Sequence, residues 1–377
     1  MIAEQARVPV KVWAYRWFFP AASLYAAVAI PLSVHAITSG MPWPPGLTGL
    51  GHAYEMLFGF ALALVAGYTL GQMPRGELLL LFALWLTARL MIVVPFDIPM
   101  HVFNALFVVT LAWHVVPKFL AAKKWRNRIV SPLLLVLCIL PVIYGITDYL
   151  TPTMEKQYLL LLQGVLLFSL LMAFMGGRII AAAAAGEAHR MGAELQARVQ
   201  PRLEAALIIL LTIAVAALLF PEGYLVAGSC AALAGCIAAI RLYRWQLWSW
   251  HWPDLICLGI GYGWLALGLV LYGAGIYWQD YLTAALHVIT VGALGTLSTG
   301  IMARFQHQHP ERQAPPLRIV LVTTLLIATS VLLRGAAGLV EEVRVELLWT
   351  SAASWSCAYL FLAFHLCGDR WRSWMRR

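Results

Sequence analysis

Twelve runs of about 20 mostly apolar residues follow one another along the 377-residue chain, and they constrain its fold more than any other feature. Charged residues make up only 11% of the sequence, too few to cover a water-facing surface of this size. A helix of about 20 residues crosses roughly 30 Å of hydrocarbon, and it satisfies its backbone hydrogen bonds internally. We therefore expect an all-α, polytopic membrane protein of about 12 transmembrane helices, over residues 17–38, 50–72, 77–95, 97–117, 129–150, 156–176, 203–220, 222–240, 254–276, 280–303, 316–335 and 345–367.

The basic residues predict the orientation of these helices. With both termini on one side of the membrane, 22 of the 26 Lys and Arg residues fall on that side. Only Lys156, Arg334 and Arg344 fall on the other side, and Arg89 lies within a span. Because cytoplasmic loops carry the excess of basic residues, both termini are predicted to be cytoplasmic. The net charge of +9 is then explained by topology, and we expect the lipid bilayer as partner and no nucleic acid.

We expect one integral membrane domain over 1–377, without a soluble domain. The stretch 177–202 contains strong helix formers and mixed charge, so it is interpreted as a cytoplasmic helical linker between two six-helix halves, 1–176 and 203–377. Glycines are frequent within the spans. They either allow close helix packing or make room for a flat cofactor.

Four histidines fall at one depth once each span is given its direction. His35 lies at the outer end of the first span and His52 in the first turn of the second. His101 lies near the outer end of the fourth span, and His287 about two turns inside the tenth. Four different helices therefore place an imidazole in the outer leaflet.

Other polar residues accompany these histidines. Glu55 and Met56 follow His52 at i+3 and i+4, so all three are expected on one helix face. Arg89 and Asp97 also fall in the outer half. Ionisable groups within a membrane are usually paired or functional, and we expect Arg89 to pair with Glu55 or Asp97. Each residue taken alone is explained by interior packing, but the cluster favours a metal or haem site, because imidazole binds iron and copper, Met binds Cu(I), and Arg binds a haem propionate.

Two further histidines, His307 and His309, follow His287 in the sequence. Twenty residues separate His287 from His307, which is roughly 30 Å along a helix. One site therefore cannot use both. We expect His307 and His309 in a solvated cytoplasmic loop. His365 and Cys367, near the inner end of the last span, offer only two ligands and are weak evidence for a metal site.

Several segments resemble the NnrS family, multi-span bacterial membrane proteins associated with haem, copper and the response to nitric oxide. The segments are YRWFFPAASLYA, GHAYEMLFGFALALVAGYTL, LWLTARL, GGRII and ALHVITVGALGTLSTGIMARFQHQHPER. The resemblance runs through most of the chain, and the second and the last of these segments are its longest matches. The resemblance implies a set of functional residues, which in this sequence are His52, Glu55, Met56, Arg89, His287, Arg304, His309 and Arg312.

The sequence departs from the family pattern at two positions. Tyr54 stands where the family has a second histidine, and Gly259 stands where it commonly has another. Either this chain has lost one metal, or His35, His101 and Tyr54 replace the missing ligands. Tyrosine can ligate ferric haem, although an interior hydroxyl is the simpler interpretation of Tyr54.

The resemblance and the histidine cluster together predict a haem protein of the bacterial cytoplasmic membrane that binds or handles nitric oxide and contributes to the nitrosative-stress response. The expected cofactors are haem b and copper, and an unidentified electron donor is implied. We expect His52 and His287 as metal ligands, His101, His35 and Met56 as further metal candidates, and Arg89, Glu55 and Tyr54 as cofactor-binding residues. Whether the protein turns over a substrate stays open. The alternative functions are a transporter or metal-delivery channel, with the polar cluster as its binding site, and a structural or assembly factor.

Overall fold

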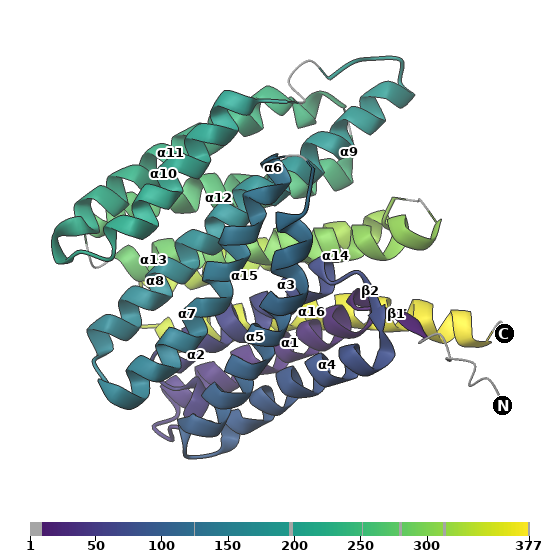
Figure 1. Ribbon diagram of the computed structural model, residues 1–377. Coiled ribbons are helices and arrows are strands. Elements are labelled where there is room, and N and C mark those ends of the chain that lie inside the picture. The colour runs from purple at the N-terminus through teal and green to yellow at the C-terminus, as the bar shows by residue number, and fades with distance from the viewer. Residues whose placement is uncertain are drawn as a thin grey trace, which may run out of the picture.

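The computed structural model describes residues 10–123, 125–195, 199–250, 252–278, 281–311 and 314–375. These residues form a bundle of helices with one small sheet (Figure 1). In the sheet, β1 (Lys11–Trp13) pairs antiparallel with β2 (Gln72–Pro74), and Val12 lies opposite Met73.

The first half of the chain contains helices that follow the predicted apolar runs closely. They are α1 (Tyr15–Thr38), α2 (Gly51–Tyr54), the π-helix η2 (Glu55–Ala61), α3 (Leu62–Thr69), α4 (Arg75–Leu90), α5 (Asp97–Leu120), α6 (Trp125–Arg128), α7 (Val130–Leu150), α8 (Met154–Leu171), the π-helix η4 (Met172–Gly176) and α9 (Gly177–Arg190). The short 3-10 helices η1 (Pro45–Leu47) and η3 (Met91–Val93) lie in the connections.

The second half continues in the same way. Its helices are α10 (Pro201–Ala217), α11 (Tyr224–Trp245), α12 (Pro253–Tyr277), α13 (Leu282–His287), the π-helix η8 (Val288–Ala293), α14 (Leu294–Glu311), α15 (Leu317–Ala336) and α16 (Arg344–Met375). The 3-10 helices η5 (Pro221–Gly223) and η6 (Leu247–Trp250) flank α11. The predicted linker 177–202 is helical as far as Arg190, where α9 ends.

Ten helices of the described residues are long and apolar enough to cross a membrane. The predicted spans 50–72 and 203–220 are not among them: the first contains His52 and Glu55, and the second forms only the 17-residue α10. The expectation of an all-α, multi-pass membrane protein is therefore confirmed. β1 and the end of α16 lie at the same end of the bundle (Figure 1).

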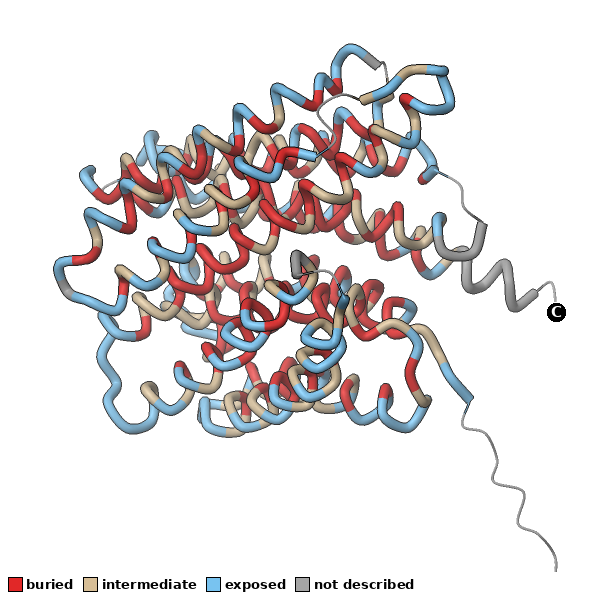
Figure 2. Tube along the Cα trace, turned by 45° about the horizontal axis from the view of Figure 1, so that its top comes forward, coloured by how far each residue is buried: buried red, intermediate tan, exposed pale blue. Residues whose placement is uncertain are grey.

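Buried residues line the inside of the bundle, and exposed residues face outward (Figure 2). Many of the outward residues are large and apolar; the side chains of Trp113, Leu325 and Phe364 are 79%, 65% and 75% exposed. Such a surface is unfavourable in water and favourable against lipid acyl chains. The outside of the bundle thus has the chemistry of a lipid-facing surface.

The first and last helices of the chain pack against each other. α1 contacts α16, α16 contacts α15, and α10 contacts both α8 and α11.

The pair of α11 and α12 is close because glycine lies in its interface: a Cβ atom at Gly235 would come within 2.6 Å of the Ala266 carbonyl oxygen. At this position the close-packing interpretation of the glycines holds.

Three helical stretches in the interior contain a π-helical segment. They are 51–69 with η2, 154–190 with η4, and 282–311 with η8. A π-helical segment has i→i+5 hydrogen bonds and is frequent at functional sites. The first and third of these stretches carry His52 and His287.

Candidate cofactor site

His52 and His287 line the same two cavities. The larger, of about 240 Å³, is also lined by Met56 and is called here the histidine cavity. The smaller, of about 110 Å³, is also lined by Arg334 and Arg344 and is called the arginine cavity. Both cavities share His52, His287 and Trp355, so they adjoin each other. Two of the four histidines predicted at one depth therefore contribute to one site.

The ring of His287 is held in one tautomer. Its Nδ1 lies 2.7 Å from the carbonyl oxygen of Thr283, one turn earlier on α13. A carbonyl oxygen only accepts, so Nδ1 must carry the hydrogen and donate it. In the neutral ring, Nε2 then keeps its lone pair, which is the arrangement that outer-sphere carbonyl groups impose on metal-binding histidines.

His52 contains a buried polar atom without a partner. Its Nδ1 makes no hydrogen bond to any group in the described part of the chain. A buried donor or acceptor that stays unpaired costs about 1–3 kcal/mol, and such groups in native structures call for an explanation, such as a ligand or ion. The ring of His52 thus has unused binding capacity beside a cavity.

Two guanidinium groups line the arginine cavity. Arg334 lies in the last turn of α15 and Arg344 begins α16, so the connection between these helices brings them together. Neither forms an ion pair or a side-chain hydrogen bond within the described ranges. Guanidinium groups bind carboxylates and phosphates through paired hydrogen bonds. This cavity therefore suits the anionic end of a ligand.

The walls of the histidine cavity are mainly apolar. Leu57, Leu162 and Leu286 line it, and Met56 adds a thioether. Trp355 is held in place because its Nε1 donates to the carbonyl oxygen of Ala26, 3.1 Å away. Apolar walls with a few polar groups at defined places are typical of cofactor sites.

Glu55 and Arg89 belong to a separate buried network. Arg89 Nε lies 3.1 Å from Glu55 Oε2, which confirms the predicted pairing of these two residues. Arg89 also donates to Asn104 Oδ1 at 2.9 Å, and Asn104 Nδ2 donates to the Tyr54 hydroxyl at 2.8 Å. The Tyr25 hydroxyl donates to the same Glu55 oxygen. This network joins four helical stretches, and Glu55, Arg89 and Tyr54 do not line the histidine cavity.

Glu55 and Met56 point in different directions, although both lie at the start of the π-helix η2. It begins at Glu55, immediately after the short α2. Neighbouring residues differ in direction by about 100° around an α-helix, and the expectation that His52, Glu55 and Met56 share one face is wrong for Glu55. Met56 lines the histidine cavity with His52, whereas Glu55 pairs with Arg89.

His101 and His35 lie outside both cavities. His101 Nε2 lies 3.3 Å from Asp148 Oδ2, and the ring packs edge-on against Tyr54 with 4.9 Å between the ring centroids. Gln157 donates to the other Asp148 oxygen. In the part of the chain that the structure describes, no three His, Cys, Asp or Glu side chains form a metal-binding group.

His307 lies on a helix at the opposite end of the bundle. The sequence places it in a loop, but α14 continues to Glu311, so that expectation is wrong for His307. Its Nε2 lies 2.8 Å from Nε2 of His365 on α16. The helical stretch from His287 to His307 is unbroken, which confirms that one site cannot use both.

Three further residues implied by the family resemblance are Arg304, His309 and Arg312. Arg304 forms an ion pair with Asp254 near the start of α12. The side chain of His309 and the whole of Arg312 lie outside the described residues.

Comparison with known families shows which family the chain belongs to. The family described as NnrS protein matches residues 10–368, nearly the whole sequence. The chain belongs to the NnrS family. No curated protein matches it. The two departures from the family pattern, Tyr54 and Gly259, line neither the histidine cavity nor the arginine cavity.

Proposed function

We propose that this NnrS-family protein is a membrane haem protein that binds nitric oxide and contributes to the nitrosative-stress response. The observation that carries the proposal is that His52 and His287, from two different helices, line the same pair of cavities. Family membership is consistent with a membrane protein of the nitric oxide response.

The residues of the site suit haem b. His287, with Nδ1–H bonded to Thr283, offers Nε2 as a ligand, and His52 offers a second imidazole on the facing helix. The apolar walls of the histidine cavity suit a porphyrin. Arg334 and Arg344 would hold its carboxylates, a role that the sequence alone suggested for Arg89.

Copper is the second cofactor in the proposal. Met56 lines the histidine cavity, and a thioether suits Cu(I), so Met56 is the copper candidate once both imidazoles are assigned to haem. His101 and His35 take no part in this arrangement.

The protein residues would have distinct tasks in nitric oxide binding. When bound, haem iron supplies the position at which a diatomic gas coordinates. One of His287 and His52 would hold the cofactor and the other would be displaceable by the gas, while Arg334 and Arg344 would orient the cofactor through its carboxylates. The Glu55–Arg89 pair fixes the helix that carries His52. In the proposed topology the site lies in the outer leaflet of the bacterial cytoplasmic membrane, both termini are cytoplasmic, and an electron donor reduces the haem.

An absorption spectrum of the detergent-purified protein, made with haem supplied, tests the proposal. We expect a Soret band in the oxidised and dithionite-reduced states, near-stoichiometric iron, and a shift of the reduced band when nitric oxide is added. A colourless protein free of iron and copper would contradict the proposal and favour transport, which flux measurements in proteoliposomes would then examine.

A further inference from the structure

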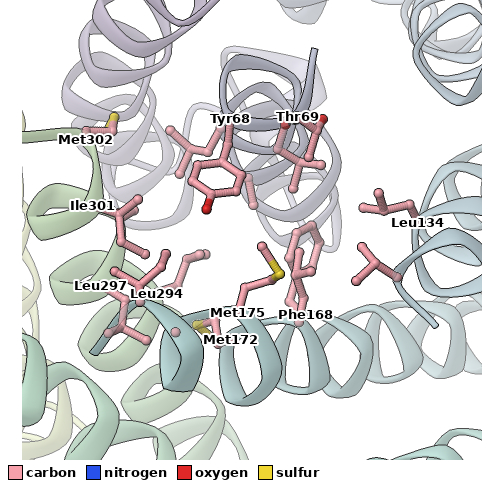
Figure 3. Close-up of a pocket in the computed structure, with 18 of the residues that line it drawn as sticks. Tyr68, Thr69, Leu134, Phe168, Met172, Met175, Leu294, Leu297, Ile301 and Met302 are labelled. Carbon is pink, nitrogen blue, oxygen red and sulfur yellow. Dashed lines mark hydrogen bonds between the residues drawn. The ribbon is translucent and has the colours of Figure 1, made fainter. Parts of the chain in front are cut away.

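A third cavity lies between the helices that carry His52 and His287, further along the bundle. It has a volume of about 110 Å³ and is lined by Phe168, Met172, Met175, Leu297 and Ile301, among others. We call it the methionine cavity. Figure 3 shows Met172 and Met175 on one side and Leu294, Leu297 and Ile301 on another.

The polar atoms around the methionine cavity do not suit water. Thr69 Oγ1 donates to the Val65 carbonyl oxygen at 2.6 Å, and Ser298 Oγ donates to the Gly295 carbonyl oxygen at 3.1 Å. Tyr68 directs its hydroxyl into the space, so it offers a water one hydrogen-bond partner (Figure 3). A buried water usually makes about three hydrogen bonds, and purely apolar cavities of similar size stay dry and bind xenon or benzene.

The methionine cavity and the histidine cavity lie in series. The same three helical stretches enclose both: Leu57 and Ala61 come from the first, and Val165 and Phe168 from the second. On the third stretch, Leu294 lines both cavities, so its side chain stands between them.

Each of these three stretches contains a π-helical segment. η2, η4 and η8 all contribute residues that line one or both cavities. A π-helical segment widens the helix locally, and such segments are frequent at functional sites. The three π-helical segments all face the same pair of cavities, and this observation does not depend on the volumes of the cavities.

We propose that the methionine cavity binds a small, neutral, apolar molecule of about the size of xenon or a diatomic gas, and passes it past Leu294 to the histidine cavity. Binding stands on the cavity alone; delivery rests on the proposed haem at His52 and His287. The polarizable sulfur atoms of Met172 and Met175 favour such a ligand.

Xenon is the probe for the binding step. The full-length protein is purified in detergent and its xenon sites are located by anomalous scattering from xenon-pressurised crystals. We expect a xenon atom between Met175 and Leu297. Met175→Trp should fill the cavity and abolish that atom, whereas Met154→Trp, on the same helix but at a side chain that is 72% exposed, should keep it. Val65→Phe, with the exposed Val109→Phe as control, repeats the test should Met175→Trp fail to fold.

Carbon monoxide association with the reduced protein after flash photolysis tests delivery. We expect association to be several-fold slower in Met175→Trp, with an unchanged Soret band, and unaltered in Met154→Trp. Xenon binding that survives Met175→Trp, or an acyl chain that fills the cavity and excludes xenon, would overturn the binding site. If a variant no longer binds xenon but still binds carbon monoxide at the wild-type rate, the delivery step is wrong and the binding site stands. A protein without haem would overturn delivery together with the proposed function and leave xenon to decide the binding site.

Discussion

Arg89 and Glu55 form an ion pair in the interior of the bundle, with Nε and Oε2 3.1 Å apart and side chains only 2% and 0% exposed. The pair joins α4 to the π-helix that follows His52. Its partners Asn104 and Tyr25 belong to α5 and α1. Polar side chains from four helical stretches thus meet at the Glu55–Arg89 pair, and Glu55 lies three residues after the proposed haem ligand His52.

Removing one member of this pair should destabilise the protein strongly. Arg89→Leu leaves the Glu55 carboxylate buried without its cation, and such losses cost about 3–5 kcal/mol. Thermal unfolding in detergent should show a large decrease in Tm for Arg89→Leu and a partial recovery in Arg89→Leu/Glu55→Leu. A single variant as stable as the wild type would show that the pair does not hold these helices together.

Gly59 should be required for the same pair. A Cβ atom at this position would overlap the guanidinium group of Arg89. Gly59→Ala should therefore displace Arg89 and lower Tm. The control is Gly76→Ala, because no atom lies within 4 Å of a Cβ at Gly76 and alanine favours the helix. Equal Tm values for the two variants would contradict the predicted overlap.

Tyr54 should matter for stability and not for the haem spectrum. Tyr54→Phe removes the acceptor of Asn104 Nδ2, and an unpaired buried donor costs about 1–3 kcal/mol. Because Tyr54 does not line the histidine cavity, the Soret band should stay in place. A shifted oxidised spectrum would instead support Tyr54 as a haem ligand.

Arg334 and Arg344 should retain haem through its carboxylates. The double variant Arg334→Ala/Arg344→Ala should lower the haem-to-protein ratio several-fold during purification, while lysine at both positions should preserve part of it. Arg318, an exposed residue near the other end of α15, provides the control. Full haem occupancy in the double alanine variant would remove these residues from the site.

The position of each polar residue along its helix could be predicted from the sequence, because hydropathy locates the helices. The direction of each side chain around its helix could not. His35 and His101 share the predicted depth of His52 and His287, yet His101 contacts Asp148 and His35 lines neither cavity. Neighbouring helices decide which residues meet, and a single sequence does not specify them.

Two other features needed the structure for related reasons. The sequence predicts that Arg334 and Arg344 lie on the outer side, but only the packing of α15 against α16 shows that they line a cavity with both histidines. The sequence does not indicate Asn104 or Tyr25, because one amide or hydroxyl in an apolar span gives no pattern. The π-helical segments also leave the hydropathy profile unchanged, so the sequence does not indicate them.

The central claim, that His52 and His287 hold haem, is tested most directly by the haem content and reduced absorption spectrum of His52→Ala and His287→Ala. His307→Ala is the matched control, because His307 lies on the same helical stretch as His287 but at the opposite end of the bundle. The account predicts that both cavity variants fold with the Soret band lost or strongly shifted, while His307→Ala keeps the wild-type spectrum. Wild-type spectra in folded His52→Ala and His287→Ala would contradict it.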